Sequence, residues 1–258
     1  MDFNVSQHSV QLIQFTDLHL LGCATDTMRG HSPVHSFERV LAHAAREHAP
    51  WDALLLTGDL VNDDIGGYHQ LTRLLGELPT PVYCIPGNHD SLPDMREMLS
   101  QAPFQIGGSA HLGGWLLVML NSQVEGQAEG WLSANELARL EEALSTQTHE
   151  HALITLHHHP IRASSAWLGD VALKNAADLF KVLDRYPTVR GVVWGHTHQQ
   201  ADAQRQGVHL LGTPSTCVQF DPASDRFAID HRPPAYRRIT LQADGAIATH
   251  VVWVPEPT

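Results

Sequence analysis

Short apolar runs recur along the chain, and longer segments with a different periodicity separate them. Apolar runs of this length, bounded by Gly, Pro or Asp, predict buried strands. The runs are Val10–Phe15, Ala53–Thr57, Val82–Ile85, 115–120, 152–156 and Val189–Trp194.

The intervening segments carry apolar residues at the spacing of an amphipathic helix. In the first of them, Phe37, Val40, Leu41 and Ala44 follow this spacing, and Ser36 is the expected N-cap. Further helices are predicted over 68–78 and 175–186, over a short stretch capped by Ser91, and after the capping box formed by Ser133 and Glu136.

Strands that alternate with helices predict a layered α/β fold. The part of the chain from about residue 207 is β-rich, and its runs Ala235–Leu241 and Ile247–Trp253 are joined by Asp244-Gly245, a hairpin signal. No repeat or linker interrupts the pattern, so we expect residues 1–258 to form a single domain.

Composition narrows the class of protein. The 258 residues include 16 basic and 28 acidic side chains, giving a net charge of −12, which argues against a broad nucleic-acid surface. Bound divalent cations can still attract a phosphate substrate. The three cysteines show no paired spacing, the first five residues do not resemble a signal peptide, and no apolar run is long enough to span a bilayer. We therefore expect a cytoplasmic protein without membrane or nucleic-acid partners, either a monomer or a homodimer.

Five polar motifs occur along the chain, and most directly follow a predicted strand. Open α/β sheets place ligands at the carboxyl ends of their strands. Each motif alone can be explained without a metal, as a turn, a cap or a surface histidine. Five motifs in this order predict a two-metal centre. The motifs are Asp17-Leu18-His19, Gly58-Asp59, Gly87-Asn88-His89-Asp90, His157-His158-His159-Pro160 and Gly195-His196-Thr197-His198.

The chemistry of the side chains gives each motif a role. Asp59 has two carboxylate oxygens and can bridge two cations. Asn88 offers a neutral amide oxygen, and His89 can contact a substrate phosphate without binding metal. In the histidine run we favour His157 as the ligand, because alternation on an extended chain sends its neighbours elsewhere. His158 and His159 then serve as outer or substrate-side groups, or as structural histidines.

The order and type of these motifs resemble the calcineurin-like metallophosphoesterase superfamily. Further segments are similar to bacterial class III 3′,5′-cyclic AMP phosphodiesterases, and the resemblance extends from about Leu12 to His250. These segments are 156–160, Ser165-Ala166-Trp167-Leu168, Leu173-Lys174-Asn175-Ala176 and 213–220. Two residues depart from the family pattern: Leu18 stands where many relatives have a small polar residue, and Asn121 of Asn121-Ser122 stands where Asp-Ser is expected. Neither is an expected ligand.

The resemblance implies a four-layer αββα sandwich and two divalent metal ions, with Fe²⁺ or Mn²⁺ favoured over Zn²⁺ or Co²⁺. It also implies the site residues. One metal takes Asp17, His19, Asp59 and His198, and the other takes Asp59, Asn88, His157 and His196. The implied catalytic residues are His89 and Asp59, and the implied substrate-binding residues are His19, Asp59, Asn88, His89 and His198.

The function implied is metal-dependent hydrolysis of 3′,5′-cyclic AMP to 5′-AMP, which lowers the cyclic nucleotide signal. One alternative is another phosphodiester or phosphomonoester substrate, such as a 2′,3′-cyclic nucleotide or a glycerophosphodiester, since fold does not fix substrate. A more remote alternative is a non-catalytic metal-binding regulator. The nucleotide pocket is open to two interpretations. Residues 29–32 line it or form a solvent loop, and residues 213–220 cap it or pack in the core.

Overall fold

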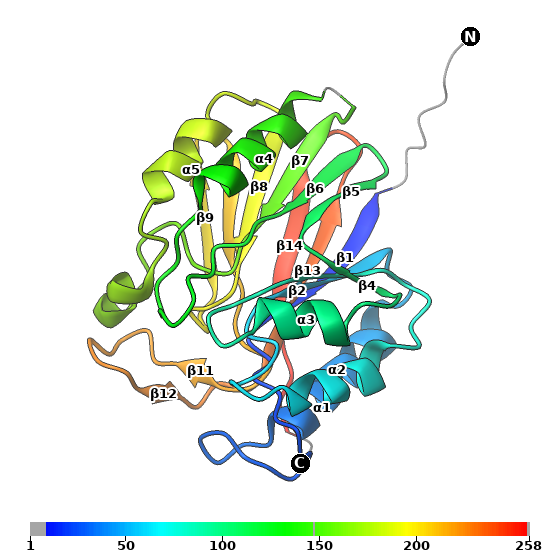
Figure 1. Ribbon diagram of the computed structural model, residues 1–258, viewed down its shortest axis with the longest axis vertical. Coiled ribbons are helices and arrows are strands. Elements are labelled where there is room, and N and C mark those ends of the chain that lie inside the picture. Colours follow the sequence, from blue (N-terminus) through cyan, green and yellow to red (C-terminus); the bar gives the residue numbers. More distant parts are fainter. Residues whose placement is uncertain (1–8, 147, 257–258) are drawn as a thin grey trace.

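Two six-stranded sheets lie face to face in the computed structural model, which describes residues 9–146 and 148–256, and helices cover their outer faces (Figure 1). The first five residues, discussed above for a signal peptide, lie outside the described part. The sheet orders are β14-β13-β1-β2-β3-β4 and β5-β6-β7-β8-β10-β9. The expected four-layer αββα sandwich is therefore confirmed.

The first sheet consists of β1 (Val10–Phe15), β2 (Ala53–Thr57), β3 (Val82–Ile85), β4 (Phe104–Ile106), β13 (Ala235–Leu241) and β14 (Ile247–Trp253). The second consists of β5 (Gly108–Leu112), β6 (Trp115–Met119), β7 (His151–Thr155), β8 (Val189–Trp194), β9 (Ala201–Arg205) and β10 (Val208–Gly212). A small hairpin contains β11 (Gln219–Phe220) and β12 (Ile229–Asp230). The helices are α1 (Pro33–His48), α2 (Gly66–Leu75), α3 (Leu92–Met98), α4 (Ala134–Ser145), α5 (Ala176–Leu183) and the 3₁₀ helix η1 (Ala166–Val171).

The central strands are continuous apolar runs because both of their faces are buried. In β2, Leu54 and Leu56 pack in the core beneath the helices of the first sheet, whereas Leu55 packs between the two sheets. In β6, Val118 packs beneath the helices of the second sheet, and Leu117 packs between the sheets. Successive side chains of a strand point to opposite faces, so each such strand serves two core layers at once.

Helix α1 begins earlier than its apolar spacing predicts. Ser32 is the N-cap and accepts a hydrogen bond from the backbone N–H of His35, with Pro33 in the first turn. The predicted cap at Ser36 is wrong: this residue is buried inside the helix, and its hydroxyl donates to the carbonyl of Thr216. The caps at Ser91 and Ser133 are confirmed. None of the helices in the described ranges combines the length and apolar character needed to cross a bilayer.

Strands β1, β2 and β3 run parallel, as do β6, β7, β8 and β10. The polar motifs follow β1, β2, β3, β7 and β8, so all five lie at the carboxyl ends of parallel strands.

A buried arginine joins the carboxyl-terminal hairpin of the first sheet to the end of the second. Arg237 of β13 is fully buried. Its guanidinium donates at 2.7 Å to Asp202 Oδ1 on β9 and at 2.8 Å to the carbonyl of Gly212 on β10. It also donates to the hydroxyls of Thr213 and Thr249 and to the carbonyl of Ala201.

Candidate metal centre

The five motifs meet in one place, and the backbone there is unusual. Side chains other than glycine seldom adopt a positive φ, although Asp, Asn and His do so more readily than most. Eight such residues occur in the described ranges, and five of them are predicted metal ligands: Asp17 (φ 52°), His19 (50°), Asp59 (49°), His196 (65°) and His198 (48°). Backbone held in this region clusters at functional sites. Both members of each pair two residues apart, Asp17 with His19 and His196 with His198, therefore lie on left-handed backbone.

One group of ligand atoms comes from the first and last motifs. His19 Nε2 lies 3.1 Å from His198 Nε2, and His198 Nε2 lies 3.3 Å from Asp17 Oδ1. Asp59 Oδ2 lies 3.9 Å from His19 Nε2, on the side facing the second group. All four side chains are buried.

The second group surrounds the other side of Asp59. Asp59 Oδ2 lies 3.3 Å from His157 Nε2, which in turn lies 3.2 Å from His196 Nδ1. Burial opposes ionisation of Asp59, but His157 and His19 hold the pKa of its carboxyl well below the usual range. The Oδ1 atom of Asn88 is buried, and no hydrogen-bond partner for it occurs among the described residues.

Backbone carbonyls fix the orientation of three imidazoles. His157 Nδ1 lies 2.8 Å from the carbonyl oxygen of Thr57, His196 Nε2 lies 2.9 Å from that of Val171, and His198 Nδ1 lies 2.6 Å from that of Val218. A carbonyl only accepts, so each of these nitrogens carries a proton, and in the neutral ring the opposite nitrogen presents a lone pair to the site. Metal-binding histidines are typically held in this way.

These spacings suit divalent cations. Two ligands about 2.1 Å from one ion lie roughly 3.0–3.4 Å apart, depending on the coordination angle. The close nitrogen and oxygen pairs above fall in this range. Where three imidazoles turn lone pairs inward and a buried amide oxygen has no partner, a cation satisfies all of them together. In several groups of Asp and His side chains, the ligand atoms all lie within 4.8 Å of one another, and these groups include every predicted ligand except Asn88. Asn88 is absent because it is neither an Asp nor a His.

His89 lies beside the two groups rather than within the close contacts. Its Nδ1 lies 2.7 Å from Asp63 Oδ2, a partner that the sequence did not reveal. Burial lowers the pKa of His89, but the charge of Asp59 and the hydrogen bond with Asp63 outweigh it and raise the pKa above its usual value. Asp90 stabilises the same loop, because its carboxylate accepts hydrogen bonds from the backbone N–H groups of Leu60 and Gly87.

The rest of the histidine run lies closer to the site than strand alternation suggests. The His158 ring lies 4.6 Å from that of His196, and His158 Nδ1 lies 2.8 Å from Ser122 Oγ. The His159 ring stacks on His196 at 5.7 Å. Ser122, which follows the departure at Asn121, thus positions a histidine beside the candidate ligands. The other departure, Leu18, is buried in the core of the first sheet.

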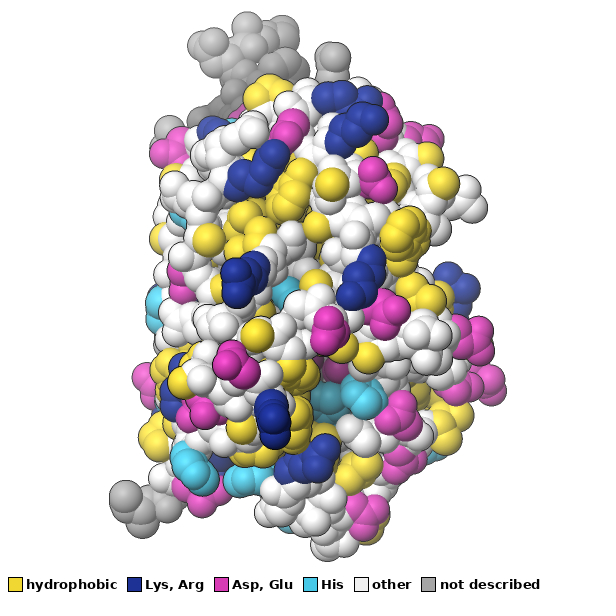
Figure 2. Space-filling model, turned by 90° about the vertical axis from the view of Figure 1, so that its left-hand side faces the viewer, with side chains coloured by type: hydrophobic (Ala, Val, Ile, Leu, Met, Phe, Trp, Pro, Cys, Tyr) yellow, Lys and Arg dark blue, Asp and Glu magenta, His cyan; other side chains and the backbone are white. Residues whose placement is uncertain are grey.

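A cavity with two lobes opens on the metal-facing side chains. Both lobes are lined by His19, His89, His198, Phe220 and Phe227. The larger lobe, about 480 Å³, is completed by Thr27, Met28, Arg29, Asn62 and Val218. The smaller lobe, about 190 Å³, is completed by Asp59, Asn88, His196 and the apolar group Ala128, Trp167, Leu168 and Val171. Figure 2 shows histidine side chains in a hollow of the surface, with acidic and basic side chains near its rim.

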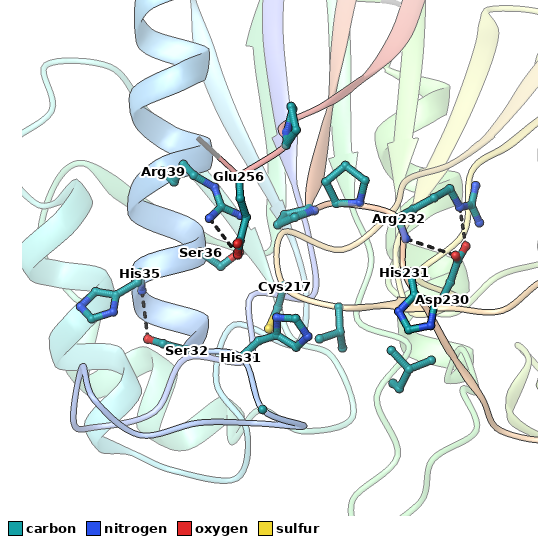
Figure 3. Close-up of a pocket in the computed structure, with 16 residues that line it drawn as sticks. His31, Ser32, His35, Ser36, Arg39, Cys217, Asp230, His231, Arg232 and Glu256 are labelled. Atoms are coloured by element: carbon teal, nitrogen blue, oxygen red, sulfur yellow. Dashed lines mark hydrogen bonds and ion pairs between the residues drawn. The ribbon is translucent and has the colours of Figure 1, made fainter. Parts of the chain in front are cut away.

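A separate cavity of about 600 Å³ lies on the other side of Val218. Figure 3 shows Arg39 and Glu256 at one side of it and Asp230 with Arg232 at the other. None of the predicted ligands lines it. The loop at residues 29–32 is therefore divided, because Arg29 faces the metal-side cavity whereas His31 and Ser32 face this one.

Comparisons with known proteins agree with this geometry. The model of the family described as calcineurin-like phosphoesterase matches residues 10–200. The chain is 37% identical over 252 residues to a 3′,5′-cyclic adenosine monophosphate phosphodiesterase, CpdA, of Vibrio vulnificus, covering 96% of this chain and 91% of that protein. It is 38% identical over 255 residues to a 3′,5′-cyclic-nucleotide phosphodiesterase of Nostoc, covering 96% of each.

Solved structures share the fold at low identity. A dimetal phosphatase from Danio rerio superposes with a TM-score of 0.64 at 14% identity, covering 95% of this chain and 99% of that one. A purple acid phosphatase from yellow lupin gives 0.69 at 11% identity, covering 97% of this chain and 55% of that one.

Proposed function

The chain belongs to the calcineurin-like phosphoesterase family, and we propose that it hydrolyses 3′,5′-cyclic AMP to 5′-AMP at a dinuclear metal centre. The observation that carries this proposal is the convergence of inward-facing ligand atoms at one end of a cavity with aromatic walls. The charged phosphate suits the ligand atoms, and the planar base suits the aromatic walls. The names of the two relatives support the choice of substrate.

The ligands divide between two ions in this proposal. Asp17, His19 and His198 would hold one ion with Asp59, and Asn88, His157 and His196 would hold the other, so Asp59 would be shared by both. Two divalent cations bound there would supply Lewis acidity and an activated water at neutral pH. Carbonyl-held imidazoles and left-handed backbone keep the ligands in place before binding, so little reorganisation is needed.

His89 is the proposed catalytic acid. Hydrolysis forms a bond from the water oxygen to phosphorus and breaks the bond from phosphorus to the ribose O3′, which then needs a proton. Asp63 holds Nδ1 of His89 and favours the protonated ring, so the other nitrogen can donate to O3′ or stabilise charge on the phosphate. His19, Asn88 and His198 line the cavity beside it and are proposed to contact the phosphate with His89 and Asp59.

The finer features of the proposal rest on chemistry. Mixed carboxylate, amide and imidazole ligands suit Fe²⁺ or Mn²⁺, which we favour, and also Zn²⁺ or Co²⁺. All three cysteines are free, as expected of a cytoplasmic protein. We further propose a single domain, because the core between the sheets includes side chains from β1 near one end of the chain and β13 near the other.

The test is hydrolysis of 3′,5′-cyclic AMP by the purified protein with added Mn²⁺ or Fe²⁺, beside 2′,3′-cyclic AMP and a bis-aryl phosphodiester. We expect metal-dependent formation of 5′-AMP with a kcat/KM at least equal to that for the aryl diester. Rapid turnover of the aryl diester with negligible cleavage of 3′,5′-cyclic AMP would contradict the proposal that cyclic AMP is the substrate. It would leave the proposed metal centre standing.

A further inference from the structure

We propose that the larger lobe of the metal-side cavity binds the nucleobase, with Phe227 as its stacking platform and Asn62 as the group that reads the base edge and favours adenine over guanine. This inference rests on the proposed function. It concerns residues outside the metal-ligand motifs, and no ligand role was predicted for either of them from the sequence.

The size and position of the lobe suit a nucleoside. Its volume of about 480 Å³ lies within the usual range of small-molecule pockets, whereas the smaller lobe at about 190 Å³ does not. The larger lobe opens directly on His19, His89 and His198. A substrate whose phosphate lies at these side chains therefore has room for its base on this side.

Two phenylalanines form the boundary between the lobes. Phe220 is already stacked on His198, with ring centroids 3.9 Å apart and planes within 8°, so that face is occupied. Phe227 meets Phe220 edge-on at 5.2 Å and is 46% exposed, which is high for a large apolar side chain. Exposed aromatic rings beside a phosphate site are typical stacking surfaces for bases, and each stack contributes about 1–3 kcal/mol.

A tight turn lies beside Phe227. Met28 and His31 exchange two backbone hydrogen bonds, at 2.8 and 3.0 Å, across Arg29 and Gly30, whose φ values are 54° and 85°. Two central residues with positive φ are typical of a type I′ turn. The turn holds Arg29 with its guanidinium carbon 4.9 Å from the centre of the Phe227 ring. This contact holds the Phe227 ring in place and covers one of its faces, so the base is proposed to stack on the other face.

Asn62 supplies the polar recognition. Its backbone N–H donates to the carbonyl of Leu20, and the next residue, Asp63, is tied to His89 by both backbone and side chain. The Asn62 side chain is therefore carried on a fixed loop, and it lines the larger lobe. An asparagine amide presents a donor and an acceptor side by side, which match N7 and the amino group of adenine, whereas guanine offers two acceptors on that edge.

The first experiment compares the wild type with Asn62→Ala on cyclic AMP, cyclic GMP and a bis-aryl phosphodiester. We expect the wild type to prefer cyclic AMP. Asn62→Ala should lower kcat/KM for cyclic AMP about tenfold, mainly through KM, and bring the cyclic AMP to cyclic GMP ratio close to one. Turnover of the aryl ester, which has no base edge, should not change.

The second experiment tests the platform with Phe227→Leu and Phe227→Trp. Leucine keeps apolar bulk without a planar face, so KM should rise about tenfold for both cyclic nucleotides, whereas tryptophan should keep it near wild type. A base-free substrate, the methyl riboside 3′,5′-cyclic phosphate, should be cleaved equally by all three proteins. Trp131→Ala is the matched control, because Trp131 is 50% exposed and lines neither lobe.

The outcomes separate this inference from the proposed function. An unchanged nucleotide ratio in Asn62→Ala, or an unchanged KM in Phe227→Leu, overturns the base site while cyclic AMP hydrolysis by the wild type stands. A wild type that cleaves the aryl ester but neither cyclic nucleotide overturns both proposals.

Discussion

Two groups of buried polar side chains differ in how their hydrogen bonds are satisfied. The guanidinium of Arg237 is fully buried, and acceptors on Asp202, Thr213, Thr249, Ala201 and Gly212 surround it. At the metal centre, by contrast, imidazole nitrogens face one another at 3.1 and 3.2 Å, and Asn88 Oδ1 has no partner in the described ranges. Buried polar groups are normally paired. The fold achieves this pairing at Arg237, so its absence at the strand ends indicates a place for cations.

The largest effect is expected from Asp59→Ala, because Asp59 lies in both groups of ligand atoms. The variant should lose both metals and reduce kcat by on the order of 10³-fold or more. Metal content by mass spectrometry, measured with the activity, checks this. A variant that retains two metals per chain would exclude the bridging role.

Removing the metals should lower the stability of the folded protein, because the buried polar groups of the metal centre then lose their partners. Ions that bind only the native state stabilise it by about 4 kcal/mol when present at 1,000 times their dissociation constant. We expect a chelator to abolish activity and lower the melting temperature of the wild type. Asp59→Ala serves as the control, and its melting temperature should not respond. An equal response of both proteins would show that the chelator acts elsewhere.

His89→Ala should separate chemistry from metal binding. His89 lies outside the close ligand contacts and is held by Asp63. Loss of one well-placed electrostatic group typically costs about 10²–10³ in rate, so kcat should fall by this factor while metal content stays at the wild-type level. Full activity, or a metal-free protein, would assign His89 a different role.

Arg237→Met should affect stability and leave the metals in place. The change leaves buried carbonyls and hydroxyls without their donor, at an expected cost of about 3 kcal/mol. Asp202 is half-exposed and recovers water, so the cost lies at the lower end for a broken buried pair. Urea unfolding measures the loss, and metal content is the control. If metal content falls in the folded variant as sharply as in Asp59→Ala, the two regions are not independent.

The sequence was informative about the candidate ligands because parallel strands bring their carboxyl ends to one edge. The contact of Asp17 with His198, 181 residues later, needs one further condition, because β1 and β8 belong to different sheets: the two sheets must stack with these carboxyl ends on the same side. Backbone partners were hidden, since the carbonyls of Val171 and Val218 have no signature in residue type. Strand β9 was missed because its residues, Ala201–Arg205, alternate without a strong apolar face.

Competition between local signals explains another error. Ser32 and Ser36 are both acceptable helix caps by residue type, but Ser32 caps the helix with Pro33 in the first turn, and the hydroxyl of Ser36 donates to the carbonyl of Thr216, far along the chain.

The pairing of β1 with β13 has a consequence for the order of events during synthesis. Val10 lies opposite Leu241 in this pairing, so the strand that leads to Asp17 and His19 meets this neighbour only after Ala235–Leu241 has been synthesised. Contacts between such distant residues form slowly, and an unpaired strand edge is open to other chains in the meantime. A chain synthesised as far as residue 234 thus holds all seven candidate ligands while still lacking β13 and β14 of their supporting sheet. Truncation at the ribosome before β13 would leave an exposed edge where the finished protein has a covered one.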